Sequence, residues 1–299
     1  MYSDHIKTTQ QLTIHMNTAV NMKIVCGIQS PRYAHTKKII KTDKIPKSIG
    51  CIMADNLKIG FKTNIFNQND PYAHVNTLEE KNDIRRFRRQ MNQLTLDAEQ
   101  IMIREHTRDQ VNAPRAMMIV YNIICWSIDK IYEGKPLDRF WMLETIARQP
   151  YFSYVAILHM YETLGWWEVD GELRKAHAEE EYNETMHLKI MESMGADRLW
   201  WNRFLARHSS IAYFALLLFF YLFTPRLAYL SSELLERHAV DTYDQFYEEN
   251  EELLKNMACT EAALTYQPNA RSMYDVFRSI SNDENKHANA MQLVKELPN

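Results

Sequence analysis

Glycine and proline are scarce in this chain, with only seven glycines and nine prolines among 299 residues. Both residues interrupt helices, so their scarcity, together with abundant Met, Leu, Tyr and Glu, favours a mostly helical protein. The length allows one large domain or two small ones, and a hydrophobic content of 46% is ample for a core.

Other absences narrow the function. The four cysteines, Cys26, Cys51, Cys125 and Cys259, show no C-x-x-C spacing, so neither a zinc site nor a disulfide framework is indicated. A net charge of −3 and the lack of a basic patch interleaved with aromatics argue against a nucleic-acid partner. The uncharged stretch Ile211–Phe223 is too short to span a bilayer, which takes about 20 apolar residues, and fits a buried or interfacial helix.

The N-terminal region differs in composition from the rest. Residues 1–42 contain a single acidic residue, Asp4, alongside six lysines and arginines and many threonines. This composition is typical of an organelle transit segment, although a plain disordered arm explains it equally well. Helical periodicity is lacking up to about residue 75. We therefore expect an N-terminal arm over residues 1–75 and a domain over residues 76–299.

The later part of the chain has the patterns of several long helices. Pro150 is expected to kink the helix Asp138–Gly165. Besides Ile211–Phe223, the expected helices cover Arg115–Tyr132, Asp138–Gly165, Gly171–Gly195, Arg226–Asn256 and Ser272–Leu297.

Two Glu-x-x-His motifs, Glu184–His187 and Glu284–His287, lie on separate expected helices. Residues i and i+3 share one helix face, so each motif presents a carboxylate and an imidazole to the same point. Either motif alone is weak evidence. Glu184 also follows the acidic run Glu179–Glu181, so a solvated face is an alternative for the first motif.

Two further glutamates, Glu144 and Glu236, lie on apolar helices ahead of the motifs. A buried carboxylate costs several kcal/mol unless it is paired or bound to metal. Glu144 has an alternative partner in Arg139 or Arg148, and Glu236 has charged neighbours. Four helices carrying Glu, Glu-x-x-His, Glu and Glu-x-x-His nevertheless match the ligand set of a di-iron or di-manganese carboxylate bundle.

Three more polar residues accompany these ligands. Asn183 and Asp283 each precede a motif glutamate, where they are either acceptors that orient the imidazoles or exposed polar residues. Tyr243 lies two helical turns after Glu236 on the same face. It is either a redox partner of the metal or a core tyrosine with a satisfied hydroxyl.

The chain contains, in this order, the segments Leu143–Arg148, His159–Trp167, Asn183–His187, Glu236–Phe246 and Asp283–His287. Together these five segments resemble the signatures of the alternative oxidase family. Where the mitochondrial branch reads Leu-Glu-Glu-Glu-Ala, this chain reads Leu-Glu-Arg-His-Ala at residues 235–239, which is similar to the plastid terminal oxidase branch. The resemblance covers roughly residues 110–295.

The resemblance implies an all-α, ferritin-like four-helix bundle that lies in one membrane leaflet. The helices Arg115–Tyr132 and Asn202–Phe223 take the places of the two that bury apolar faces in that leaflet. It implies a quinol oxidase that binds two iron ions and reduces O2 to water without pumping protons. The plastid-type motifs favour plastoquinol over ubiquinol and a thylakoid over a mitochondrial membrane, and the family's habit implies a homodimer.

The resemblance also assigns roles to residues. It makes Tyr243 the redox-active tyrosine and places the iron ligands at the same six positions as the spacing argument. The implied ligands are Glu144, Glu184, His187, Glu236, Glu284 and His287, and the implied quinol pocket is lined by Arg139, Leu143, Leu235, Ala239 and Thr242.

One departure and two alternatives stay open. The connection at residues 260–271 is shorter than in plant plastid enzymes, which puts in doubt any role of that insert. A soluble di-iron oxygenase, desaturase or ferroxidase would use the same ligand pattern. A metal-free helical protein that binds membranes or partners would leave the five ordered segments unexplained.

Overall fold

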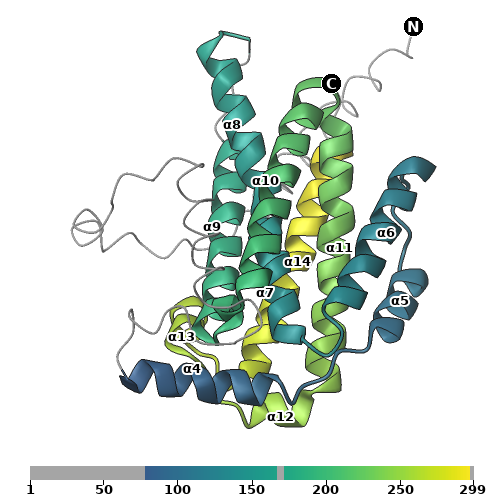
Figure 1. Cartoon of the computed structure of the whole chain (residues 1–299). Coiled ribbons are helices and arrows are strands. Elements are labelled where there is room, and N and C mark those ends of the chain that lie inside the picture. Colours follow the sequence, from purple (N-terminus) through teal and green to yellow (C-terminus); the bar gives the residue numbers. More distant parts are fainter. Residues whose placement is uncertain (1–77, 167–171, 297–299) are drawn as a thin grey trace, which may run out of the picture. The chain divides into compact units, whose positions relative to one another are not determined.

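The computed structural model describes residues 78–166 and 172–296, and all regular structure within these residues is helical (Figure 1). The expected arm over residues 1–75 lies outside the described residues. The all-α prediction is confirmed. The helices are α4 (Leu78–Met91), α5 (Ala98–Thr107), α6 (Arg115–Ile131), α7 (Pro136–Ala147), α8 (Gln149–Thr163), α9 (Glu172–Ser193), the short 3-10 helix η1 (Ala196–Arg198), α10 (Trp200–Phe223), α11 (Pro225–Glu249), α12 (Glu251–Lys255), α13 (Glu261–Tyr266) and α14 (Met273–Glu296).

The four helices that carry the predicted ligands form the bundle. In it α11 packs against α14, and α7 packs against α9. The prediction of one kinked helix over Asp138–Gly165 was wrong in detail, because the chain breaks at Arg148 into α7 and α8. Pro150 lies in the first turn of α8, where its missing N–H leaves no helical hydrogen bond unmade. Helix α7 likewise begins at Pro136 rather than at Asp138.

Helix α10 is longer than its uncharged stretch predicted. The thirteen residues Ile211–Phe223 are only the second half of a 24-residue helix that begins at Trp200. Within the described part of the chain, α10 is the one helix long and apolar enough to cross a membrane by length and composition. The stretch read as a thirteen-residue helix is therefore part of a longer one, and its length was underestimated. Helix α10 also packs along α7, α8 and α11, and it buries Asn202, Ala206 and Leu217.

Two hydrophobic clusters fill the bundle, and the predicted ligands lie between them along the chain. One cluster contains Phe140 of α7 and Ile280 of α14, and the other contains Tyr151 of α8 and Met291 of α14. Glu284 and His287 thus lie on α14 between residues of the two clusters. Carboxylates in this position are removed from water on both sides, which is the setting that a buried metal centre requires.

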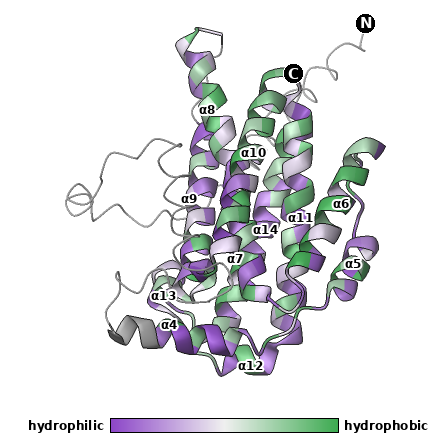
Figure 2. Cartoon of the chain, viewed as in Figure 1, coloured by the Kyte–Doolittle hydropathy of each residue, from purple (hydrophilic) through white to green (hydrophobic). Residues whose placement is uncertain are grey.

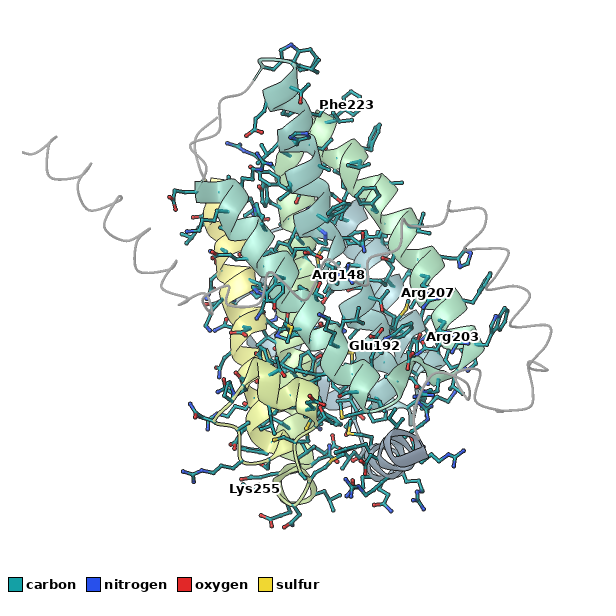
Figure 3. All side chains as sticks on the ribbon, turned by 90° about the vertical axis from the view of Figure 1, so that its left-hand side faces the viewer. Arg148, Glu192, Arg203, Arg207, Phe223 and Lys255 are labelled. Atoms are coloured by element: carbon teal, nitrogen blue, oxygen red, sulfur yellow. The ribbon has the colours of Figure 1, made fainter. Side chains whose placement is uncertain are left out.

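Helices α6 and α10 carry long hydrophobic stretches (Figure 2). The side chains of Ile123 and Trp126 on α6 are 58% and 63% exposed, and those of Phe219 and Phe223 on α10 are 56% and 68% exposed. Figure 3 places Phe223 and Lys255 at opposite ends of the bundle. Exposed apolar side chains are thus concentrated on two helices, which in soluble monomers is unusual.

Candidate metal centre

All six predicted ligands converge in the interior of the bundle. They form two groups of four possible ligands, in which the ligand atoms lie within 4.8 Å of one another, and the two groups share the bridging pair Glu184 and Glu284. We call Glu144 with His187 the first half, and Glu236 with His287 the second half. Glu144 and Glu236, which belong to one group each, are called the terminal glutamates. Each of the six side chains is at most 3% exposed.

The bridging pair faces both halves. In the first half, Nδ1 of His187 lies 3.0 Å from Oε1 of Glu284, 3.7 Å from Oε2 of Glu184 and 3.6 Å from the terminal carboxylate. In the second half, Nδ1 of His287 lies 2.7 Å from Oε1 of Glu184, 3.7 Å from Oε2 of Glu284 and 3.9 Å from the terminal carboxylate. Each bridging glutamate therefore directs one oxygen into each half.

The donor set fits two metal ions. One oxygen of each terminal carboxylate, both oxygens of each bridging carboxylate and Nδ1 of each histidine are buried without a hydrogen-bond partner. Buried polar atoms without partners are rare and costly. These atoms divide into four for each half, and the four carboxylates carry the charge that two divalent cations neutralise. Imidazole and carboxylate ligands suit iron or manganese.

Burial and mutual contact divide the carboxylates into two kinds. Burial raises the pKa of Glu144 to about 8. Burial, followed by the charges of the bridging pair, raises the pKa of Glu236 well above its usual range. Burial also opposes ionisation of Glu184, but the two imidazoles outweigh it and lower the pKa of that carboxyl. Burial thus favours the protonated form of the two terminal carboxylates, and the imidazoles favour the ionised form of Glu184 and Glu284.

A tyrosine contacts each terminal carboxylate. The hydroxyl of Tyr243 donates to Oε1 of Glu144, and the hydroxyl of Tyr151 donates to Oε1 of Glu236 at 2.7 Å. Burial is the largest cause that raises the pKa of both tyrosines well above 10, so both keep their protons. Tyr243 was predicted from the sequence. Tyr151 was missed, although it follows Glu144 by the same seven residues that separate Tyr243 from Glu236.

Asp283 faces the outer nitrogen of a ligand histidine. Its Oδ2 lies 3.8 Å from Nε2 of His187 and accepts hydrogen bonds from Tyr266 at 2.6 Å and from Asn183 at 3.1 Å. Asn183 thus acts through Asp283 and does not itself accept from an imidazole among the contacts described. The hydroxyl of Tyr266 lies 3.4 Å from Nε2 of His187. Tyr266 belongs to α13, in the connection that sequence reasoning left without a role.

The residues expected to line a quinol pocket lie on α7 and α11. Arg139 and Thr242 are buried, and the three apolar residues are partly buried. The guanidinium of Arg139 donates to Oδ1 of Asp129 at 2.5 Å and to Nε2 of His238 at 3.2 Å. Nε of Arg139 and Oγ1 of Thr242 are buried without a hydrogen-bond partner. Both are polar atoms whose hydrogen-bonding capacity the described contacts leave unused.

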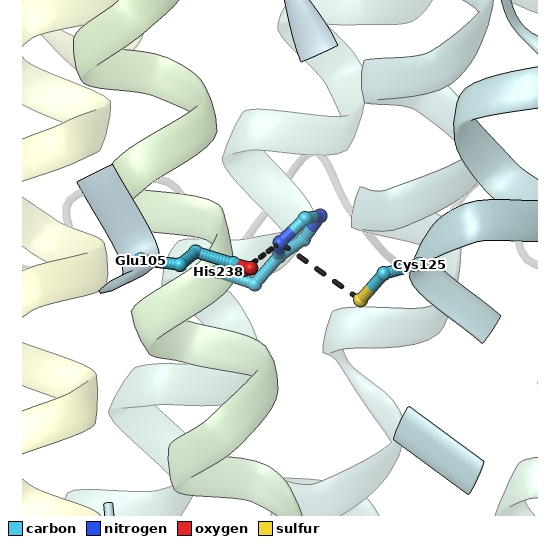
Figure 4. Close-up of side chains that lie close together, drawn as sticks. All are labelled: Glu105, Cys125 and His238. Atoms are coloured by element: carbon cyan, nitrogen blue, oxygen red, sulfur yellow. Dashed lines mark hydrogen bonds and ion pairs between the residues drawn. The ribbon is translucent and has the colours of Figure 1, made fainter. Parts of the chain in front are cut away.

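A third group of possible metal ligands, separate from the other two, lies beside Arg139. It consists of Glu105, Cys125 and His238 (Figure 4). Nδ1 of His238 lies 2.5 Å from Oε1 of Glu105 and 4.0 Å from Sγ of Cys125. Arg139 can only donate, so its hydrogen bond to Nε2 requires a neutral His238 whose ring proton is on Nδ1, facing Glu105. Nδ1 then has no lone pair for a metal ion, and the group holds Arg139 in place.

Comparison with known proteins decides the family. The profile of the alternative oxidase family, described as "Alternative oxidase", matches residues 91–296. This chain belongs to the alternative oxidase family.

The relatives of this alternative oxidase chain include plastid and mitochondrial proteins. It is 39% identical over 191 residues to ubiquinol oxidase 4, chloroplastic/chromoplastic, of Arabidopsis thaliana, covering 57% of this chain and 54% of that protein. It is 29% identical over 164 residues to ubiquinol oxidase 2, mitochondrial, of the same plant, covering 54% and 46%. It is 25% identical over 178 residues to ubiquinol oxidase 1, mitochondrial, of Glycine max, covering 58% and 55%.

The matched region spans about half the length of these curated relatives. The higher identity to the chloroplastic protein confirms the likeness to the plastid branch that the residues 235–239 indicated.

Proposed function

We propose that this chain is a membrane-associated quinol oxidase that binds two iron ions and reduces O2 to water without pumping protons. The observation that carries the proposal is the pair of ligand groups that share Glu184 and Glu284, found in a chain of the alternative oxidase family. When bound, the two irons supply the redox chemistry that couples quinol oxidation to O2 reduction.

The residues of the protein itself supply a proposed quinol site and a tyrosine next to the metal ligands. Arg139 and Thr242 offer a buried donor and a buried hydroxyl to a quinol oxygen, and Asp129 and His238 hold the guanidinium. Tyr243 follows Thr242 on α11 and donates to Glu144, so the same helix carries a contact of the proposed quinol site and a contact of the first half. We assign Tyr243 the transfer of an electron and a proton between them, and Leu143, Leu235 and Ala239 the apolar wall of the pocket.

The exposed apolar residues of α6 and α10 support attachment to one leaflet. A monotopic helix buries one apolar face among lipids and keeps its other face on the protein. Helix α10 has this form, because it packs on the bundle through Ala206 and Leu217 while Phe219 and Phe223 are exposed. The likeness to a chloroplastic/chromoplastic relative supports a plastid membrane. The thylakoid as that membrane and plastoquinol as the donor stay predictions. The homodimer that the resemblance implies stays a prediction.

The test is oxygen uptake by the detergent-solubilised protein on addition of a short-chain quinol, measured with its iron content. We expect uptake that resists cyanide, which silences contaminating haem oxidases, and two irons per chain. Glu184→Gln removes a ligand shared by both halves and should abolish iron binding and uptake. Glu172→Gln, on the exposed start of the same helix, is the matched control and should retain both.

Two outcomes would contradict the proposal. Two irons without quinol-dependent uptake would point to a di-iron oxygenase, desaturase or ferroxidase instead. A wild-type protein that takes up no iron would reject the metal centre itself.

A further inference from the structure

Tyr151 and Tyr243 are related by a reciprocal arrangement across the metal centre. Tyr151 follows Glu144 by seven residues and donates to Glu236, whereas Tyr243 follows Glu236 by seven residues and donates to Glu144. Each tyrosine therefore reaches from one terminal glutamate's segment to the other's. Both are at most 1% exposed.

The two hydroxyls determine which carboxylate oxygens remain for metal. In each terminal glutamate Oε1 accepts the tyrosine hydroxyl, and Oε2 is the buried oxygen without a partner. A carboxylate that is hydrogen-bonded through one oxygen cannot rotate freely, so its other oxygen is held toward the metal position. Without the hydroxyl of Tyr151, the carboxylate of Glu236 would lose the hydrogen bond that orients it.

The surroundings of the two rings differ. The ring of Tyr243 stacks on Phe140 at 4.4 Å, on the helices that carry all of the proposed quinol residues. The ring of Tyr151 lies edge-on to His287 at 5.5 Å, and 5.8 Å from His177. Tyr151 comes from α8, which contributes none of the proposed quinol residues. Its hydroxyl contacts Glu236 and its ring contacts His287, both of the second half.

We propose that Tyr151 is the positioning residue of the second half, where it orients Glu236 so that this half binds its ion as tightly as the first half binds the other. The proposal rests on the proposed di-iron centre, and it concerns metal binding rather than quinol oxidation. Removing a group that orients a ligand typically lowers metal affinity by about 10–100-fold.

The experiment is an anaerobic Fe2+ titration of the apoprotein in detergent, by equilibrium dialysis, for five proteins. Wild type should bind two ions with similar affinity. Tyr151→Phe and Tyr243→Phe should each weaken one ion by about 10–100-fold and leave the other unchanged, and the double variant should weaken both. Tyr154→Phe, a buried tyrosine on the same helix whose ring packs on His177, is the control and should match wild type.

The outcomes separate this proposal from its alternatives. Unchanged binding of both ions by Tyr151→Phe would overturn it. If the double variant still held one ion tightly, both tyrosines would serve the same half and the reciprocal assignment would be wrong. Equal weakening by Tyr154→Phe would mean that packing, not the hydroxyl contact, is responsible. Two ions bound normally by a wild type that lacks quinol oxidase activity would refute the proposed function and leave this assignment intact.

Discussion

At the scale of single residues, Tyr243 differs from Tyr151 in what its ring adjoins. Its neighbour in sequence is Thr242, whose hydroxyl is buried without a partner, and its ring packs among Phe140 and Phe277. A tyrosine whose hydroxyl contacts a metal ligand, on a helix that also carries proposed quinol residues, fits the redox role that the proposed function assigns to it. Tyr151 has the hydroxyl contact but no such position.

This difference predicts that excess iron separates the two variants. Tyr243→Phe should keep two irons at saturating Fe2+ and still lose most quinol oxidation, because the phenyl ring cannot give up a proton with its electron. Tyr151→Phe should recover its activity at saturating iron. Oxygen uptake as a function of Fe2+ concentration measures both. Normal turnover by iron-loaded Tyr243→Phe would remove the redox role from this residue.

The six ligands were open to prediction because each Glu-x-x-His pair shares a helix face, and because Glu144 and Glu236 interrupt apolar faces. Residues contributed by the shorter helices α5 and α13 were not. Tyr266 contacts Asp283 from a six-residue helix in a connection without periodicity. Glu105 meets His238 over a separation of 133 residues, which no local pattern encodes. Tyr151 had a detectable signal, the repeated Glu-to-Tyr spacing, that went unused.

At the scale of helices, type and order were predictable and ends were not. Apolar periodicity located the helices that hold the ligands. The break at Arg148 was read as a kink, since a proline near a helix start and one within a helix look alike in sequence. The length of α10 was underestimated because Arg203 and Arg207 end the uncharged stretch, although both lie within the helix. Arg203 is buried, and its guanidinium donates to the carbonyl oxygens of Asp197 and Arg198.

The end of ligand helix α9 depends on Gly195. Its φ of +87° lies in the left-handed region, and a Cβ there would come within 2.7 Å of Cγ2 of Ile84. Gly195→Ala should lower the free energy of unfolding by about 1–2 kcal/mol for the backbone, and further through displacement of Ile84. Gly134→Ala, with φ +67° and no atom within 4 Å of its Cβ, should show the backbone cost alone.

Denaturant unfolding of the two alanine variants in detergent measures this difference. Gly195→Ala should have the lower midpoint. Equal midpoints would show that Ile84 moves aside without cost and that α4 does not brace the end of α9.

At the scale of the whole molecule, the bundle joins a buried polar centre to an exposed apolar surface. The ligands are enclosed by two hydrophobic clusters, while the apolar side chains that remain exposed are concentrated on α6 and α10. Such a surface is stable in water only if something covers it. Under the proposed function a membrane leaflet would cover it and would also hold the hydrophobic quinol.

This arrangement predicts that vesicle binding depends on α6 and α10 but not on the α12 region. Burying an Ile or Phe side chain contributes about 1.5–3 kcal/mol, so Ile123→Glu and Phe219→Glu should each weaken binding to lipid vesicles by at least about tenfold. Leu253→Glu on α12 is the control, because Leu253 is 53% exposed, similar to Ile123 at 58% and Phe219 at 56%. Vesicle co-flotation at constant protein helicity measures the effect. Equal flotation of all three variants would show that these helices face another protein surface, and a loss confined to Phe219→Glu would leave α10 as the sole membrane contact.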